Sequence, residues 1–174
     1  MKQMVTAKNP ELVYGDQAVQ VDVQVAKGIP DAPAESDIRR WLEHVVDQLE
    51  SDATRTVEFS VRIVDEDEGR ALNKQYRDID KATNVLSFPL LDTEMPAELP
   101  LVLGDIVICG PVVAREAAEQ GKSSSDHWAH MMVHGALHLF GYGHETDEQA
   151  QEMEALEARI LAQGGIDNPY ECRD

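Results

Sequence analysis

Five of the six histidines lie in one short stretch, residues 127–144, which reads HWAHMMVHGALHLFGYGH. His134 and His138 are four residues apart, so a helix would place both rings on one face. Gly141 follows three residues later and can take the left-handed conformation that ends a helix. His144 lies three residues beyond it. The spacing therefore predicts that these three imidazoles bind one metal ion, with bonds of about 2.0–2.1 Å.

His130 also stands four residues before His134 and is a competing candidate ligand. A helix rises about 12 Å over the eight residues from His130 to His138, and two metal–nitrogen bonds cannot close that distance. Only an adjacent pair can share the ion. The pair His134 and His138 is favoured because the glycine turn supplies it with a third histidine, and His130 is expected behind a ligand or facing the substrate.

Three neutral imidazoles leave a zinc ion with its double positive charge and one open position, which is typical of a catalytic site. The expected nucleophile is a zinc-bound water, because zinc lowers the pKa of its water towards about 7. We expect one Zn²⁺ per chain. Other divalent transition metals such as Ni²⁺ suit the same ligands.

The spacing HxxxHxxGxxH is also that of the metzincin proteases. Those enzymes carry a glutamate directly after the first histidine as general base. Gly135 stands at that position here. A glycine supplies no base, although we expect it to leave room for a bulky substrate, so the pattern disfavours a protease.

The elements that must position these residues follow from the hydrophobic pattern. Alternating or continuous apolar runs predict four strands, at residues 19–25, 57–63, 85–88 and 101–109. Helical spacing and capping residues predict five helices, at residues 36–50, 66–77, 111–121, 124–139 and 147–163. We predict one α+β domain over residues 18–174, with a small mixed β-sheet packed with about five helices. Residues 1–17 are expected to be a loose arm, and residues 92–100 a mobile acidic loop.

The composition limits the possible partners. The chain has 33 acidic and 15 basic residues, a net charge of −18, which repels polyanions at long range and argues against a general nucleic-acid binder. We expect no DNA partner. No apolar run approaches the roughly 18 residues that cross a bilayer, and no signal peptide is evident, so we expect a cytoplasmic protein without a membrane contact. Cys109 is expected to be a buried free thiol.

The segment HGALHLFGYGH, residues 134–144, resembles the signature HGxLHLxGYDH of the YbeY family. Two further stretches, residues 72–89 with TNVLSFP at their end and residues 103–108 with LGDIVI, resemble that family's central block and following strand. The resemblance covers roughly residues 19–170. Gly143 departs from it, because the family has aspartate there. An aspartate could orient a ligand histidine, a role that Glu145 or Asp147 could take here.

The resemblance implies a single-domain zinc-dependent endoribonuclease that acts on single-stranded RNA. It also implies a role in maturation of the 3′ end of the small-subunit (16S) rRNA and in ribosome quality control. The ligands carry over onto His134, His138 and His144, and the family's important arginine falls on Arg77. An arginine fork binds phosphate oxygens, so we expect Arg77 to be catalytic.

The implied partners are ribosomal RNA and the small ribosomal subunit with its basic proteins. We expect Lys74, Lys81 and His130 to contact the substrate. Two alternatives stay open. One is a non-catalytic ribosome-assembly factor with a structural zinc site, and the other is a metal hydrolase that acts on a different substrate.

Overall fold

The computed structural model describes residues 19–49, 56–90 and 99–171. The predicted arm at residues 1–17 and most of the predicted acidic loop at 92–100 lie outside these ranges. The described strands are β1 (Val19–Val25), β2 (Val57–Val64), β3 (Val85–Pro89) and β4 (Leu101–Cys109). The described helices are α2 (Glu35–Leu49), α3 (Glu66–Arg77), α4 (Gly110–Gln120), α5 (Ser124–Leu139) and α6 (Asp147–Gln163). They confirm the predicted α+β domain.

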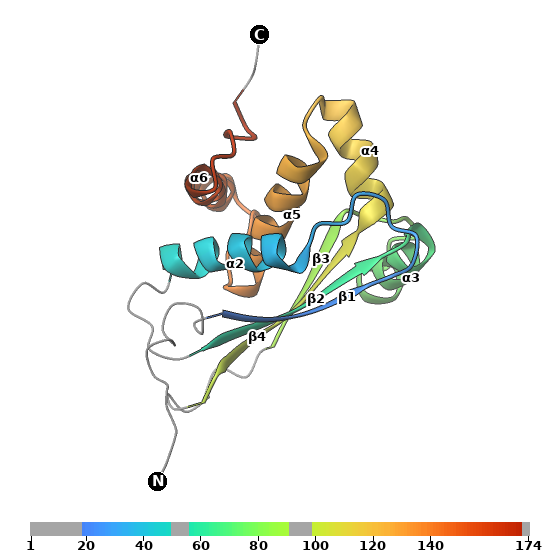
Figure 1. Ribbon diagram of the computed structural model, residues 1–174, viewed down its shortest axis with the longest axis horizontal. Coiled ribbons are helices and arrows are strands. Elements are labelled where there is room, and N and C mark those ends of the chain that lie inside the picture. Colours follow the sequence, from blue (N-terminus) through green and yellow to red (C-terminus); the bar gives the residue numbers. More distant parts are fainter. Residues whose placement is uncertain (1–18, 50–55, 91–98, 172–174) are drawn as a thin grey trace.

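The four strands form one mixed sheet in the order β1-β2-β4-β3 (Figure 1). The neighbours β1, β2 and β4 are parallel, while β3 runs antiparallel to β4, from Val85 opposite Ile108 to Pro89 opposite Gly104. Strand β3 is therefore at an edge of the sheet. Its outer side has no partner strand in the described part of the chain.

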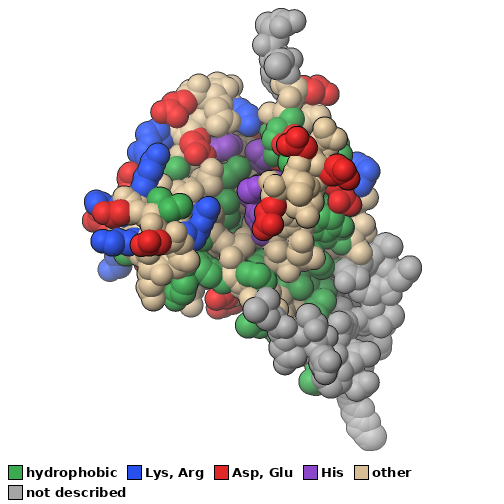
Figure 2. Space-filling view, turned by 180° about the vertical axis from the view of Figure 1, so that it is seen from behind, with side chains coloured by type: hydrophobic (Ala, Val, Ile, Leu, Met, Phe, Trp, Pro, Cys, Tyr) green, Lys and Arg blue, Asp and Glu red, His purple; other side chains and the backbone are tan. Residues whose placement is uncertain are grey.

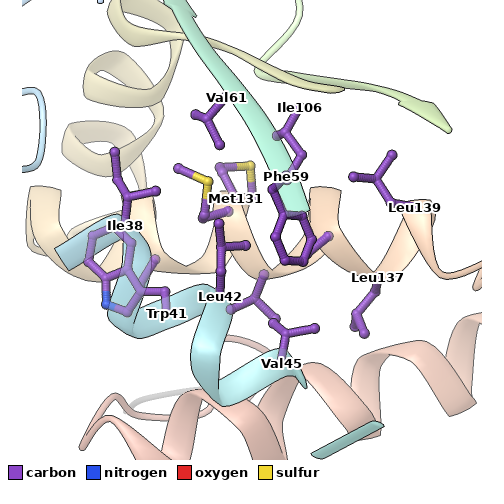
Figure 3. Packing of buried hydrophobic residues seen from close by; sticks show 14 of the residues in the cluster. Ile38, Trp41, Leu42, Val45, Phe59, Val61, Ile106, Met131, Leu137 and Leu139 are labelled. Carbon is purple, nitrogen blue, oxygen red and sulfur yellow. The ribbon is translucent and has the colours of Figure 1, made fainter. Parts of the chain in front are cut away.

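Alternation along the strands gives the sheet two apolar faces. Ile106 and Ile108 of β4 pack in the main core with helices α2, α5 and α6, which lie on the same side of the sheet in Figure 1. Figure 3 shows this core, in which Trp41 and Leu42 of α2 and Phe59 of β2 belong to one cluster. Val107, which lies between Ile106 and Ile108 in β4, faces a smaller cluster, against which Leu72 of α3 packs. Cys109 belongs to that cluster and is buried and free, as predicted.

Helix α5 lies at the centre of the fold, in contact with α2, α4, α6, β3 and β4. It begins where the hydroxyl of Ser123 accepts a hydrogen bond from the backbone N–H of Asp126 at 3.1 Å. It ends at Leu139, and Gly141 then adopts a φ of +99°, which confirms the predicted glycine turn. Because apolar neighbours surround most of this helix, its histidines need polar partners of their own.

Gly135 faces the sheet and lies between the two histidines predicted to bind metal. A Cβ atom there would lie 2.9 Å from Cγ2 of Ile106 and 3.1 Å from Cγ2 of Val85. The hydroxyl of Ser87 donates a hydrogen bond to the carbonyl of Gly135 at 2.9 Å. The prediction that this glycine leaves room for a substrate is therefore wrong. The missing side chain instead lets α5 approach strands β3 and β4 closely.

No helix in the described part of the chain is long and apolar enough to cross a membrane.

The close approach at Gly135 predicts a measurable loss of stability in Gly135→Ala. The added methyl group would overpack a core that cannot shift cheaply, so we expect the free energy of unfolding to fall by about 1–3 kcal/mol. Urea denaturation in the presence of a chelator measures this without a contribution from bound metal. Gly143→Ala is the matched control, because a Cβ atom there meets nothing within 4 Å. Equal stability of the two variants would contradict the packing role.

Candidate metal centre

The three predicted ligands converge in the structure. His134 and His138 project from α5, and His144 comes from the turn before α6. One ring nitrogen from each of the three lies within 4.8 Å of the others. The two Nε2 atoms of His134 and His138 are 3.1 Å apart. The geometry therefore brings together all three residues that the sequence spacing singled out.

Hydrogen bonds to the far side of two rings fix which nitrogen faces the centre. The Nδ1–H of His134 donates to Oε2 of Glu157 at 2.5 Å, and the Nδ1–H of His138 donates to the carbonyl oxygen of Tyr142 at 3.0 Å. A neutral imidazole with its proton on Nδ1 carries a lone pair on Nε2. The two Nε2 lone pairs thus face each other, an arrangement that fits a shared divalent cation.

The ligand rings differ in exposure. His134 and His138 are half-buried, whereas His144 is exposed. Burial lowers the pKa of His138, and the neighbouring His134 and His144 lower it further. The ring of His138 is therefore neutral and able to bind a metal at neutral pH.

Glu157 is a functional residue that the sequence prediction missed. Its side chain lies on α6, is 0% exposed and accepts hydrogen bonds from His134, from Nε2 of His130 at 3.3 Å and from the hydroxyl of Tyr170. Burial alone raises the pKa of this carboxyl, but the hydrogen bonds from His130, His134 and Tyr170 outweigh burial and hold it at about 2. Glu157 is therefore a buried carboxylate directly behind a metal ligand, which fixes the orientation of that ring.

The family's aspartate, which Gly143 replaces here, was expected to orient a ligand histidine. The structure assigns that role to other groups than the predicted Glu145 or Asp147. Glu145 uses its backbone N–H to contact Gln149, and Asp147 is exposed at the start of α6. Neither contacts a ligand histidine in the described part of the structure. The rings of His134 and His138 are oriented by Glu157 and by the carbonyl of Tyr142 instead.

A cleft of about 620 Å³ opens beside the histidines. It is lined by the three ligands, by Tyr76 and Arg77 at the end of α3, and by residues 83–89, which include all of β3. Figure 2 shows histidine side chains in a hollow, with most of the visible Lys and Arg side chains gathered on one side of it. The fold therefore places Arg77 and the histidines in one cleft, although they are far apart in the sequence.

Arg77 differs from three other arginines, Arg62, Arg70 and Arg115, in having no acidic partner in the described part of the chain. Arg70 contacts Asp80 at 2.7 Å, and the guanidinium groups of Arg62 and Arg115 contact carboxylates as well. Arg77 is exposed and makes no ion pair or hydrogen bond with any residue that the structure describes. Its guanidinium is therefore available to an anion in the cleft.

The other three residues expected at the substrate do not line this cleft. Lys74 and Lys81 are exposed on α3 and on the loop after it. His130 is buried behind His134, with its Nε2 3.3 Å from Glu157 and 3.1 Å from the hydroxyl of Tyr170. A substrate contact by any of these three stays a prediction, and the structure gives His130 a place in the network behind the ligands.

Comparison with known proteins points to one family. The family model described as Endoribonuclease YbeY matches residues 22–165. The Endoribonuclease YbeY of Halorhodospira halophila is 58% identical over 143 residues, which cover 82% of this chain and 90% of that protein. That of Stutzerimonas stutzeri is 50% identical over 152 residues, 87% of this chain and 91% of that protein. The solution structure of TM1509 from Thermotoga maritima shares the fold, with a TM-score of 0.53 at 23% identity over 84% of this chain and 92% of that one.

The carboxylate behind His134 predicts that Glu157→Gln weakens metal binding. The amide keeps the shape of the side chain but removes the charge that holds the Nδ1 proton of His134, so we expect metal affinity to fall about 10–100-fold. Competition with a chromophoric zinc chelator measures the affinity. Glu154→Gln, an exposed position on the same helix, controls for the loss of one negative charge nearby. If both variants bind zinc like the unmodified protein, Glu157 does not tune the site.

Proposed function

The chain belongs to the YbeY family, and we propose that it is a zinc-dependent endoribonuclease that hydrolyses phosphodiester bonds in single-stranded RNA. The observation that carries this proposal is that Arg77, with no acidic partner in the described structure, lines the same cleft as His134, His138 and His144. Phosphodiester hydrolysis needs both a group that binds the phosphate and a group that activates water. In the cleft, Arg77 can bind the phosphate, and the three histidines can hold a metal that activates water.

The charge of the cleft supports an anionic substrate despite the net charge of −18. None of the described residues that line the cleft is aspartate or glutamate. Arg77 is the one lysine or arginine among these lining residues. A phosphate in the cleft therefore meets a cation without a carboxylate among the described lining residues, and salt screens the exposed acidic side chains beyond the cleft. The same lining gives a basic ribosomal protein no acidic partner at this site, which favours the enzyme over a purely protein-binding role.

In the proposed reaction, the guanidinium of Arg77 binds two phosphate oxygens through its paired N–H donors. His134, His138 and His144 would hold a zinc ion through ring nitrogens, and Glu157 and Tyr142 keep the rings of His134 and His138 aligned. Zinc bound there would supply an activated water and polarise a phosphoryl oxygen. The described lining of the cleft offers no carboxylate base.

We also propose a biological role for this activity. The substrate is ribosomal RNA, the reaction matures the 3′ end of 16S rRNA on the small subunit in the cytoplasm, and the same activity serves ribosome quality control. The names of the relatives support an endoribonuclease. Zinc is favoured because three imidazoles with one open side are typical of catalytic zinc, although the same ligands bind Ni²⁺.

The test is cleavage of an end-labelled single-stranded RNA by purified, zinc-loaded protein, with a matched duplex as comparison. We expect His138→Ala to abolish cleavage because it removes a ligand. We expect Arg77→Ala to slow cleavage on the order of 100-fold because it removes a donor to the developing charge. Arg70→Ala is the matched control, since Arg70 lies on the same helix but is paired with Asp80, and it should cleave at the unmodified rate.

Two outcomes would count against the enzyme. Equal cleavage by His138→Ala, Arg77→Ala and the unmodified protein would mean that a contaminating nuclease cuts the RNA. Lack of cleavage by the pure protein, together with co-sedimentation of His138→Ala with small subunits, would support the non-catalytic assembly role instead.

A further inference from the structure

Tyr76 presents an aromatic ring at the wall of the cleft. Its side chain is 57% exposed, the largest exposed fraction among the described large hydrophobic residues. It lines the cleft together with Arg77, the next residue, and with the three histidines. A large ring kept in contact with water within a binding cleft is typical of a surface that a ligand covers.

Phe88 holds this ring in place. The two ring centroids are 4.9 Å apart with an interplanar angle of 66°, an edge-to-face contact. Phe88 belongs to β3, where backbone pairing with β4 places it opposite Asp105, and it packs against the smaller apolar cluster. The Tyr76 ring is thus supported by the sheet through Phe88. The ring also lines the cleft, and its contact with Phe88 reduces the side-chain freedom that would be lost on binding.

We propose that Tyr76, supported by Phe88, is a stacking site for one base of the RNA next to the phosphodiester held by Arg77. This inference rests on the proposed function. Bases and phosphates alternate along an RNA strand. Tyr76 and Arg77, the last two residues of α3, place an aromatic ring next to a guanidinium, so one can contact a base and the other a neighbouring phosphate. Proteins that bind single strands combine these two elements, an aromatic platform for bases and a cation for the backbone.

The stacking site gives a physical reason for acting on single strands. A base in a duplex is already stacked and paired, so turning it onto Tyr76 costs those contacts, whereas an unpaired base loses little. Every base has an aromatic face, so a ring contact of this kind tolerates different sequences. Tyr76 therefore selects RNA by its unpaired state more than by its sequence.

The first experiment measures binding without cleavage, in the His138→Ala background, with a single-stranded oligoribonucleotide that carries 2-aminopurine. Stacking on Tyr76 quenches this fluorophore. We expect an added Tyr76→Ala substitution to weaken binding about 10-fold or more and to remove the quench. Tyr76→Phe keeps the aromatic ring and should keep the affinity. Ile79→Ala is the control, because Ile79 is 43% exposed and follows Tyr76 by three residues but is outside the described lining of the cleft. Thermal unfolding checks that each variant folds.

The second experiment places an abasic nucleotide at successive positions of the same RNA. At one position the loss caused by Tyr76→Ala should disappear, because no base remains to stack there. An equal loss at every position, or unchanged binding and quenching by Tyr76→Ala, would overturn the stacking site and leave the endoribonuclease proposal intact. If the protein binds no RNA either with His138 or in the His138→Ala background, both the stacking site and the proposed function fail.

Discussion

Two imidazoles whose Nδ1 protons are already engaged can turn only lone pairs towards each other, and such an arrangement needs a positive charge between them. This constraint organises the centre of the protein. It requires a helix that carries both rings on one face, a turn that returns a third, and acceptors behind the rings that hold the protons. Helix α5, the turn at Gly141, the carboxylate of Glu157 and the carbonyl of Tyr142 meet these requirements. The sheet positions α5, because Gly135 allows the helix to lie against Ile106 and Val85.

The local parts of this arrangement were predictable. The bounds of α3, α5, α6 and β4 agree with those expected, because periodic apolar residues and capping side chains act over a few residues. The strand order was not predictable, since pairing joins distant segments. The orientation of Gly135 depends on which element lies opposite, and the sequence pattern around His134 and His138 does not contain that information. Arg77 was identified only by family resemblance, because nothing in its own neighbourhood distinguishes it from a surface arginine.

Glu157 shows why a buried functional carboxylate is difficult to predict from the sequence pattern. Met153, Leu156, Ile160 and Leu161 form the inward face of α6, and Glu157 lies on that face among them. A glutamate on an acidic helix is usually solvated. For Glu157, only its position within the apolar stripe of α6 indicates that the side chain is buried. A single charge at an inward helical position is worth treating as a candidate partner for a nearby histidine cluster, because an unpaired carboxylate would not be buried there.

Strand β3 lines the cleft along its whole length and lies at the edge of the sheet. Five consecutive lining residues therefore belong to one strand, whose backbone course is fixed by its pairing with β4. Related proteins that keep this pairing would share that course. Diversification of RNA preference among them would then come from the side chains along the cleft and not from its backbone.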